Sequence, residues 1–358
     1  MSQQNVLYLC PLGQQHREWR MAAAPSEFSV IMRRSTEISR AEVLQILPQV
    51  DALISERTGA IDAEMIAAGS RLKIIQRLGS LHHDIDLAAA QARNIPVCYR
   101  PIRSVIAVAE QMMMEVLNVS RRAMPLQHVV RRAPERFTIS APLGPNDKPT
   151  EVPFASRRTT EDVFAFNWSR EQQVRLLYGK TIGILGFGEV GAELTRRLQG
   201  WNCRVLYAKR QRFSVDIEQN MHIEYRSQDE LLRQSDIVVS LLPYFKETDQ
   251  WLNAERIATM KPGALLCHAG SGSVIDERAV ADAVRSGQLG GAAFDTFEWE
   301  PIKPDNPLLM LADSDPEANI FLTPHIGSCN DTGVSEFIEF YGNVWNALNG
   351  KLLEGRIV

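Results

Sequence analysis

The sequence predicts an α/β protein built from doubly wound parallel sheets. Short apolar runs alternate along the chain with helical patterns, which is typical of parallel strands covered by helices on both faces. With 358 residues, the chain is longer than one hydrophobic core usually supports. A Gly-rich turn also stands between a strand pattern and a helix pattern near Gly186. We therefore expect two α/β units.

Each unit has its own series of apolar runs. In the first unit, strands are expected at 6–10, 28–32, 52–55, 73–78 and 96–99, with helices at 41–50 and 86–94. In the second unit, strands are expected within 181–187, 203–208, 236–243, 263–269, 290–295 and 319–325. An apolar helical stretch, SVIAVAEQMMMEVLNV, joins the two units.

A Pro-rich insertion at about 131–168 interrupts this order. Its five prolines, at 134, 142, 145, 149 and 153, forbid a continuous helix. Loops of this length are functional or disordered in most proteins. Two interpretations stay open: a solvated surface loop, or an arm that packs on a second subunit or edges the active site.

Composition and charge exclude several classes of protein. Hydrophobic residues make up 45% of the chain, charged residues 23%, and the formal net charge is −4, which gives no reason to expect a nucleic-acid partner. No run of 18 apolar residues predicts a membrane span. Five widely spaced cysteines show no metal-ligand spacing, and the first residues show no secretory signal. We expect a cytoplasmic protein without a metal site.

The strongest local motif is a dinucleotide-binding fingerprint, GFGEVG, between an expected strand and an expected helix. Gly186 permits the tight turn, Gly188 lets a pyrophosphate approach the backbone, and Gly191 lets the helix pack closely on the strand. Free N–H groups at the helix start, at Glu189 and Val190, then bind phosphate. A Gly-rich turn in an ordinary core is the alternative. The flanking strand and helix favour a Rossmann-like unit.

The next expected strand, CRVLYA, should end at the residue that reads the adenosine ribose. A carboxylate about 20 residues beyond the fingerprint is typical of NAD-binding sites. This chain has Lys209, Arg210 and Arg212 there instead. Cations suit a 2′-phosphate, so the sequence favours NADP. The alternative is NAD, with three solvated surface cations.

A set of motifs spread over nearly the whole chain resembles the D-isomer-specific 2-hydroxyacid dehydrogenase family. Beside the fingerprint, the motifs are LKIIQRLG, IAVAE, LLP, TMKPGALL, VIDE, AAFDTFEWEP and LTPHIGS. Their order and spacing are more specific than any one of them. The resemblance implies two Rossmann-like domains and an NAD(P)-dependent oxidoreductase acting on a 2-hydroxy or 2-oxo acid.

The resemblance also implies how the chain is divided. A split, flavodoxin-like substrate domain would take residues 1–104 and 330–358, and a central nucleotide-binding domain residues 105–329. The crossings fall near Ser104 and Cys329. Members of the family are commonly homodimers through the nucleotide domain. The cofactor contacts expected within the motifs are Leu242, Pro243, Ala269, Asp295, His325 and Gly327.

Reducing a 2-oxo acid needs a hydride from the nicotinamide and a proton for the carbonyl oxygen. His325, in TPHIG, occupies the family's acid/base position, and Glu300 occupies that of its carboxylate partner. A carboxylate bonded to an imidazolium stabilises the charged ring and fixes its tautomer. Asp295 resembles the family's acid on the nicotinamide side, and a helix or turn cap is its alternative role.

The turn CHAGSGSVIDE departs from the family pattern. Ser271 stands where the family has an arginine that clamps the substrate carboxylate. A serine offers one neutral hydrogen bond in place of a charge-assisted pair, and bonds to charged groups contribute about 1.5–3 kcal/mol. We expect Ser271 to contact the substrate, and Ser273 with Asp276 to form a capping box for the next helix.

A second departure lies in the loop LGSLHHDIDLA, where the family's backbone N–H groups meet the same carboxylate. Ser80, Leu81, His82 and His83 are the expected substrate contacts there. The paired histidines are either a new anion site or two partly exposed loop residues. Arg100 and Arg103 are either a relocated anchor for the carboxylate or plain surface cations.

Two classes of function stay open. The first is an oxidoreductase that keeps His325, Glu300 and the dinucleotide site but holds its small-molecule substrate differently. The second is a dinucleotide-sensing or scaffold protein on the same fold, without catalysis or with little of it. The retained histidine and carboxylate favour the enzyme.

Overall fold

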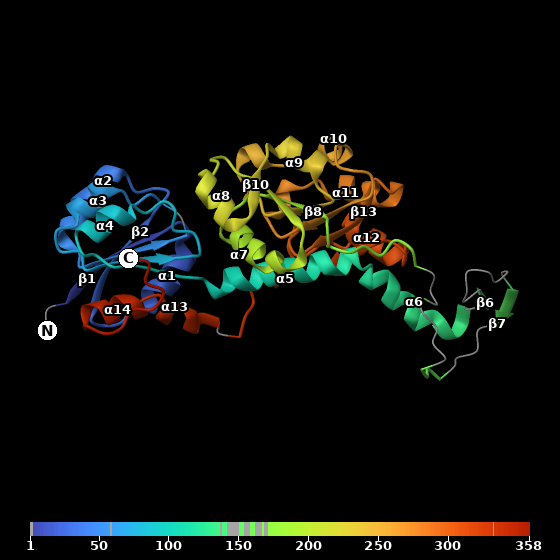
Figure 1. The fold of residues 1–358 in the computed structure, drawn as a ribbon, viewed down its shortest axis with the longest axis horizontal. Helices are drawn as coiled ribbons and strands as arrows, with labels where there is room; N and C mark the ends of the chain where they lie inside the picture. The colour runs from blue at the N-terminus through green and yellow to red at the C-terminus, as the bar shows by residue number, and fades with distance from the viewer. Residues whose placement is uncertain are drawn as a thin grey trace.

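The computed structural model describes residues 3–57, 59–136, 138–141, 150–153, 158–161, 167, 171–331 and 333–358. Within these residues the chain forms two parallel sheets flanked by helices and one antiparallel pair of strands (Figure 1). The predicted fold class, α/β with two doubly wound parallel sheets, is confirmed.

The first sheet has five parallel strands in the order β2-β1-β3-β4-β5. The strands are β1 (Gln4–Cys10), β2 (Phe28–Arg34), β3 (Ala52–Glu56), β4 (Ile74–Leu78) and β5 (Val97–Arg100). Alternate residues of β1 enter different hydrophobic clusters: Leu7 and Leu9 pack on one face, and Val6 and Tyr8 on the other. Both faces of the sheet are therefore buried.

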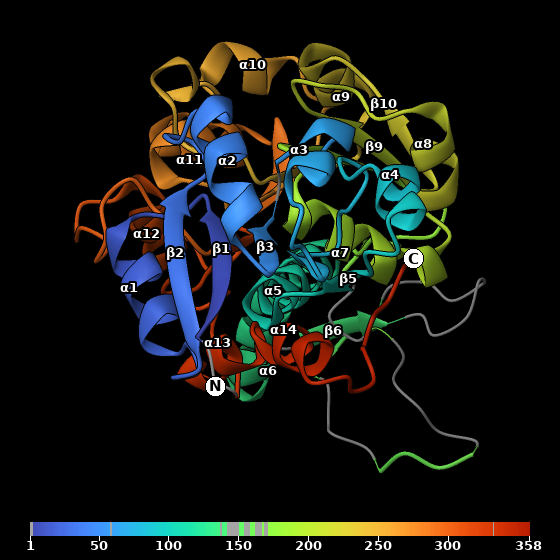
Figure 2. The ribbon, with the colours of Figure 1, turned by 90° about the vertical axis from the view of Figure 1, so that its left-hand side faces the viewer.

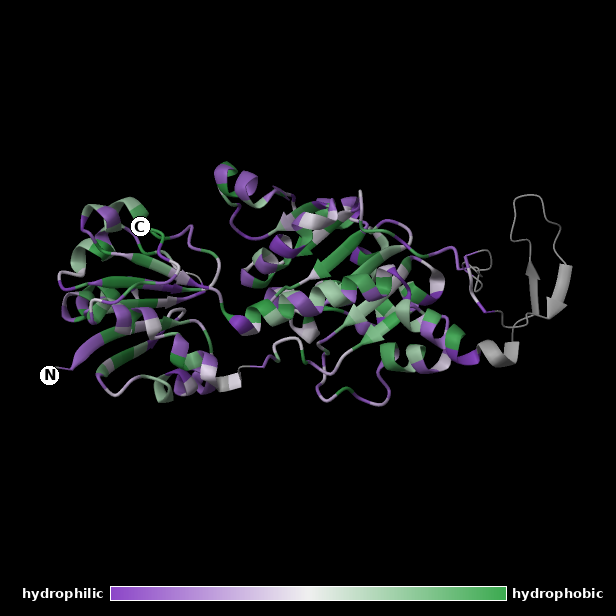
Figure 3. Cartoon of the chain, turned by 60° about the horizontal axis from the view of Figure 1, so that its bottom comes forward, coloured by the Kyte–Doolittle hydropathy of each residue, from purple (hydrophilic) through white to green (hydrophobic). Residues whose placement is uncertain are grey.

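The second sheet has seven parallel strands in the order β10-β9-β8-β11-β12-β13-β14. The strands are β8 (Thr181–Leu185), β9 (Arg204–Ala208), β10 (Ile223–Tyr225), β11 (Ile237–Ser240), β12 (Ala264–His268), β13 (Leu289–Phe294) and β14 (Ile320–Leu322). Its strands are hydrophobic along most of their length, as Figure 3 shows, which is typical of strands covered on both faces. The expected strands are confirmed in both sheets; the short edge strand β10 was not foreseen.

The described helices lie along the two parallel sheets, apart from the helix at 123–136, which continues from the helix at 103–120 away from them (Figure 1). They are α1 (Gln14–Ala22), α2 (Arg40–Ile46), α3 (Ala63–Ala68), α4 (Leu87–Ala92), α5 (Arg103–Ser120), α6 (Ala123–Arg136), α7 (Glu189–Leu198), α8 (Val215–Met221), α9 (Gln228–Gln234), α10 (Ala254–Ala258), α11 (Glu277–Ser286), α12 (Pro307–Ser314), α13 (Glu336–Glu339) and α14 (Gly342–Leu348). No helix in the described part of the chain has the length and apolar character needed to span a membrane.

Helix α5 links the two sheets. It begins directly after β5 and packs against α7, β12 and β13 of the second sheet (Figure 1). One face of α5 is buried along the whole helix, at positions 105, 109, 112, 116 and 119. This spacing follows the helical repeat and explains why the apolar run folds as a helix.

The C-terminal segment returns to the first sheet, beside the N-terminus (Figures 1 and 2). Phe340, Tyr341 and Val344 share a hydrophobic cluster with residues of β1, β3 and β4. The backbone near the C-terminus also bonds to β5, where the Tyr99 N–H donates to the Gly355 carbonyl at 2.9 Å. The core of the first sheet thus uses both ends of the described chain, and the domain boundaries near 104 and 329 stay a prediction.

The structure bears on the Pro-rich stretch and on the expected capping box. Most of the Pro-rich stretch at 131–168 lies outside the described residues; within it, α6 ends at Arg136, and β6 (Thr138–Ala141) pairs antiparallel with β7 (Thr150–Pro153). The capping box expected at Ser273 is wrong. Asp276 itself caps α11, because its side chain accepts from the Ala279 N–H at 3.0 Å, and Ser273 lies in a 3-10 turn.

Candidate active site

The Gly-rich turn after β8 leaves an open place at the start of α7. Gly186 has a φ of 82°, and a Cβ there would lie 2.8 Å from the Leu241 carbonyl oxygen. A Cβ on Gly191 would lie 3.1 Å from the Phe187 ring. Gly188, the N-cap of α7, has no neighbouring atom within 4 Å of its ideal Cβ position. The turn is therefore open at Gly188, and the start of α7 beside it is where a diphosphate is expected to bind.

Gly188→Ala is expected to weaken dinucleotide binding without unfolding the protein. Gly188 has a φ of −120°, so a Cβ adds no left-handed strain, and the methyl group meets no protein atom. It would fill the space where the diphosphate approaches, and we expect Kd to rise about tenfold or more, which corresponds to about 1.4 kcal/mol. Fluorescence titration with NADPH and thermal unfolding measure the two effects.

Gly200→Ala is the matched control, because a Cβ on Gly200 also meets no atom within 4 Å and the residue lies beyond the other end of α7. Its Kd should equal that of the unmodified protein. Unchanged NADPH affinity in Gly188→Ala would show that no diphosphate lies against this turn.

Two cations without salt bridges follow β9. The ammonium of Lys209 lies 3.6 Å from the centroid of an aromatic ring, and the side chain is half-buried, which lowers its pKa. Arg210 is exposed, with its guanidinium carbon 5.1 Å from the centroid of the Phe245 ring. Neither forms a salt bridge with any described residue. Arg212, in contrast, pairs with Glu218 at 2.7 Å. Lys209 and Arg210 are therefore available to bind an additional anion, because no described carboxylate is paired with them.

His325 and Glu300 lie in direct contact. His325 Nδ1 is 2.6 Å from Glu300 Oε2, and Glu300 Oε1 accepts from the Phe297 N–H at 3.0 Å. Both carboxylate oxygens are thus engaged, which fixes the orientation of Glu300 and of the ring. The side chains are 54% and 36% exposed, so a substrate can reach them. Because Nδ1 is engaged, Nε2 is the ring nitrogen left for a substrate.

Asp295 holds the turn that carries His325. It is 1% exposed, and it accepts from the N–H groups of Ile326 and Gly327 at 3.0 and 2.8 Å. The Thr323 hydroxyl donates to it at 2.7 Å. His325 has a φ of 51°, a left-handed conformation that residues other than glycine seldom adopt, so the turn needs such support. The expected contact of Asp295 with a nicotinamide stays a prediction.

The turn containing Ser271 is tightly packed at the carboxyl ends of β11 and β12. The Ser271 N–H donates to the Leu242 carbonyl at 2.9 Å, and the Ala269 N–H bonds back to β11 at 3.2 Å. A Cβ on Gly272 would lie 1.9 Å from the Phe297 carbonyl oxygen, so only glycine fits there. Ser271 itself is half-buried. The structure brings Ser271 together with the predicted cofactor residues Leu242 and Ala269.

The loop after β4 contacts α7 through Glu189. The Ser80 N–H donates to Glu189 Oε2 at 2.5 Å, and the Leu81 N–H lies 3.3 and 3.4 Å from the two oxygens. The Ser80 hydroxyl donates to Glu193. Glu189 is 5% exposed, and this burial raises its pKa to about 7. The expected substrate amides thus bind a carboxylate of the chain itself.

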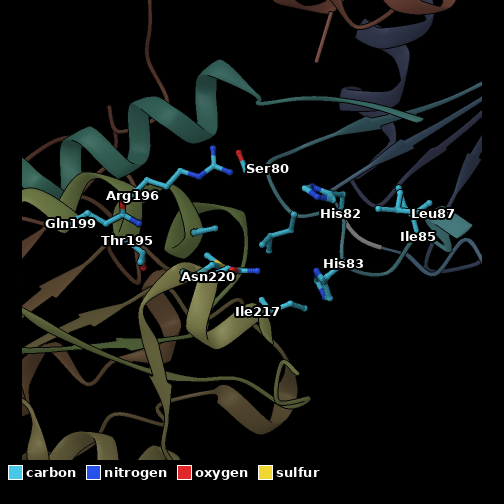
Figure 4. A pocket seen from close by; sticks show the side chains of 13 residues that line it. Ser80, His82, His83, Ile85, Leu87, Thr195, Arg196, Gln199, Ile217 and Asn220 are labelled. Carbon is cyan, nitrogen blue, oxygen red and sulfur yellow. The ribbon is translucent and has the colours of Figure 1, made fainter. Parts of the chain in front are cut away.

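His82 and His83 lie beside aromatic rings, and neither forms a salt bridge with an acid among the described residues. The ring of His82 lies 5.5 Å from that of Tyr99, and the ring of His83 stands edge-on to Phe213 at 4.7 Å. Burial lowers the pKa of both histidines. Both line a cavity of about 460 Å³ between this loop, α7 and α8 (Figure 4). At neutral pH they are poor substitutes for a charged clamp.

Arg100 and Arg103 contact the C-terminal segment. Both guanidinium groups pair with Glu339, Arg103 at 3.0 Å, and Arg100 also lies 3.3 Å from Glu354. The Arg103 N–H bonds to the Glu336 carboxylate. Carboxylates of the chain itself therefore occupy both candidate anchors.

Pro243 and Val190 were the remaining residues predicted to contact the cofactor. Pro243 is exposed in the loop that follows β11, and Val190 packs between hydrophobic clusters of the two sheets. Sequence reasoning missed Gln111 and Glu115, two polar residues of α5 that lie behind Asp295. The sequence did contain one signal: Glu115 is the one acid within the apolar segment MMMEVL, residues 112–117.

Comparison with known proteins identifies the family. Residues 153–327 match the model of the D-isomer specific 2-hydroxyacid dehydrogenase, NAD binding domain. The chain is 34% identical to a glyoxylate reductase of Pyrococcus furiosus over 303 residues, covering 84% of this chain and 80% of that protein. It is 30% identical to glyoxylate/hydroxypyruvate reductase B of Shigella boydii over 316 residues, covering 86% of each.

Solved structures share the fold. A glyoxylate reductase from Paecilomyes thermophila aligns with a TM-score of 0.52 at 24% identity, covering 100% of this chain and 99% of that one. A D-mandelate dehydrogenase from Rhodotorula graminis aligns with a TM-score of 0.54 at 22% identity, covering 99% and 98%. The chain belongs to the D-isomer specific 2-hydroxyacid dehydrogenase family, and it is an oxidoreductase that acts on a CH–OH group with an NAD(H)-type cofactor.

Proposed function

We propose that the protein transfers a hydride between NADPH and a 2-oxo acid or related carbonyl compound, with His325 as acid/base and Glu300 as its partner. The contact of 2.6 Å between His325 Nδ1 and Glu300 Oε2 carries this proposal. A second bond, from the Phe297 N–H, holds the carboxylate in place. An exposed histidine oriented by a fixed carboxylate suits proton transfer near neutral pH.

When bound, a nicotinamide would supply the hydride for the carbonyl carbon. His325 donates the Nε2 proton to the carbonyl oxygen as that oxygen gains charge, and takes a proton back in the oxidising direction. Glu300 accepts the hydrogen of the other ring nitrogen, Nδ1, and so holds the ring with Nε2 available to the substrate. The Ser271 hydroxyl offers the substrate one neutral hydrogen bond. Hydride and proton together convert C=O to CH–OH.

The proposed activity is tested by mixing the protein with NADPH and a panel of carbonyl compounds and following the absorbance of the reduced nicotinamide. We expect consumption that depends on the carbonyl compound. A protein that binds the dinucleotide tightly but turns over none of the panel would instead act as a dinucleotide sensor or scaffold.

The cofactor preference is a separate proposal. Lys209 and Arg210 lack salt bridges within the described chain, so we expect NADPH to bind more tightly than NADH. Lys209→Asp with Arg210→Ser should reverse the order, because the aspartate would bind a ribose and repel a 2′-phosphate. Fluorescence titration with each cofactor measures both affinities.

Arg212→Ser is the control for this exchange. Its guanidinium is already paired with Glu218, so removing it should leave the NADPH-to-NADH ratio unchanged. Equal affinities of the unmodified protein for the two cofactors would contradict the preference.

We further propose a homodimer formed through the second-sheet domain, working in the cytoplasm. The unpaired state of all five cysteines suits a reducing compartment. A domain division near Ser104 and Cys329 is supported by α5, which begins at Arg103, and by α13 and α14, which lie beside the first sheet (Figure 2).

A further inference from the structure

A chain of hydrogen bonds connects α5 to the turn that carries His325. Gln111 Nε2 donates to Thr323 Oγ1 at 2.8 Å, and Thr323 Oγ1 donates to Asp295 Oδ1 at 2.7 Å. Asp295 in turn accepts the N–H groups of Ile326 and Gly327. The support of the His325 turn therefore starts in a helix that begins at the first sheet.

Glu115 stands at the far end of this chain, one helical turn beyond Gln111. Gln111 Nε2 also donates to Glu115 Oε1 at 3.1 Å, so both hydrogens of the amide are used. Glu115 is 0% exposed, and no cation pairs with it within the described residues. Burial raises the pKa of Glu115 well above its usual range, and the nearby Asp295 carboxylate raises it further. Burial therefore favours the neutral acid form of Glu115 over its carboxylate.

We propose that Glu115 is a positioning residue for the reaction: acting through Gln111, Thr323 and Asp295, it sets the geometry of the His325 turn. This inference rests on the proposed role of His325. Within the described residues, Glu115 bonds to Gln111 and not to His325 or Glu300, so its influence depends on each hydrogen bond of the chain.

The donor and acceptor of each hydrogen bond explain how Glu115 affects the His325 turn. Thr323 Oγ1 has one proton, and it gives that proton to Asp295 because Gln111 supplies the donor on its other side. Glu115 keeps the Gln111 amide turned with its nitrogen toward Thr323. Without the Glu115 acceptor, the amide is free to rotate and to present its oxygen, which would take the Thr323 proton away from Asp295. The turn at His325 would then lose one of its supports.

The test compares Glu115→Leu with Glu115→Gln. Glutamine keeps a carbonyl acceptor for Gln111, so kcat should stay within about twofold and the pH–rate profile should be unchanged. Leucine removes the acceptor, and we expect kcat to fall about tenfold with a shifted pH–rate profile, since small misplacements of catalytic groups are costly. The Kd for NADPH should change little in both. Glu110→Gln is the control: its exposed carboxylate pairs with Arg197, and it should behave as the unmodified protein.

Gln111→Leu interrupts the same chain at its next bond and remains informative if Glu115→Leu does not fold. The double variant should lose no more activity than either single variant, because residues of one chain act as a unit. Full activity in folded Glu115→Leu, or equal losses in Glu115→Gln and Glu115→Leu, would overturn the inference. His325→Ala separates the two proposals: if it keeps full activity, the proposed function fails; if it is inactive while Glu115→Leu is not, only the positioning role fails.

Discussion

His325→Ala is expected to lower kcat about 100-fold or more while the Kd for NADPH stays nearly unchanged. The variant removes the one ring nitrogen that the Glu300 contact leaves available to a carbonyl oxygen. The backbone of the turn should persist, because Asp295 binds the N–H groups of Ile326 and Gly327 rather than the His325 side chain. Steady-state kinetics and a cofactor titration measure the two quantities.

Glu300→Gln tests the partner in the same assay. A glutamine has one amide oxygen, so it cannot accept from the Phe297 N–H and from His325 Nδ1 together, as the carboxylate does. We expect a lower kcat and a shifted pH–rate profile. Glu298→Gln, an exposed neighbour, is the matched control. An unchanged rate in His325→Ala would mean that another group moves the proton.

Poor turnover of glyoxylate, pyruvate and hydroxypyruvate is the second expected result, with better turnover of a larger 2-oxo acid or another carbonyl compound. Ser271 offers no charge, and the alternative anchors are engaged elsewhere. His82 and His83 have lowered pKa values, and Arg100 and Arg103 pair with Glu339. A small substrate held mainly by its carboxylate therefore lacks its clamp.

Ser271→Arg should improve kcat/KM for the small 2-oxo acids by about tenfold or more, the value of one bond to a charged group. Ser273→Arg adds the same cation two residues away and should give no such gain. The decisive measurement runs one substrate panel on the unmodified protein and both variants. Efficient native turnover of the small acids, with no gain from Ser271→Arg, would show that another group already binds the carboxylate.

The fold was predictable from the spacing of the apolar residues and from the order of the expected strands and helices along the chain. Apolar runs of five residues separated by helical patterns specify parallel strands, and the observed strands begin and end within about two residues of the expected ones in the first sheet. The glycines of the fingerprint were also predictable from the sequence: a Cβ on Gly186 would clash with the backbone at Leu241, and one on Gly191 would lie tightly against the Phe187 ring. The edge strand β10 was missed because Glu224 interrupts its short apolar pattern, whereas the equally short β14 is a continuous apolar run.

Side-chain direction in the site was harder to predict. Glu189 was expected at the cofactor, and the structure shows its carboxylate bonded to the loop at Ser80. Arg100 and Arg103 were candidate anchors, and their partners, Glu339 and Glu354, lie more than two hundred residues away in the sequence. Such pairings depend on tertiary packing, which no local pattern contains.

The return of the C-terminal segment to the first sheet has a consequence for folding during synthesis. Strands β8 to β14 follow one another without interruption in the sequence, so the pairing of the second sheet uses no strand from outside this stretch. The strands of the first sheet are made earlier, but one of its hydrophobic clusters is complete only when Phe340, Tyr341 and Val344 have been added. The Ile357 N–H also donates to the Val97 carbonyl of the edge strand β5 at 2.8 Å. Until those residues are made, the first-sheet strands keep apolar surface uncovered, and uncovered apolar surface on a partly folded chain favours aggregation.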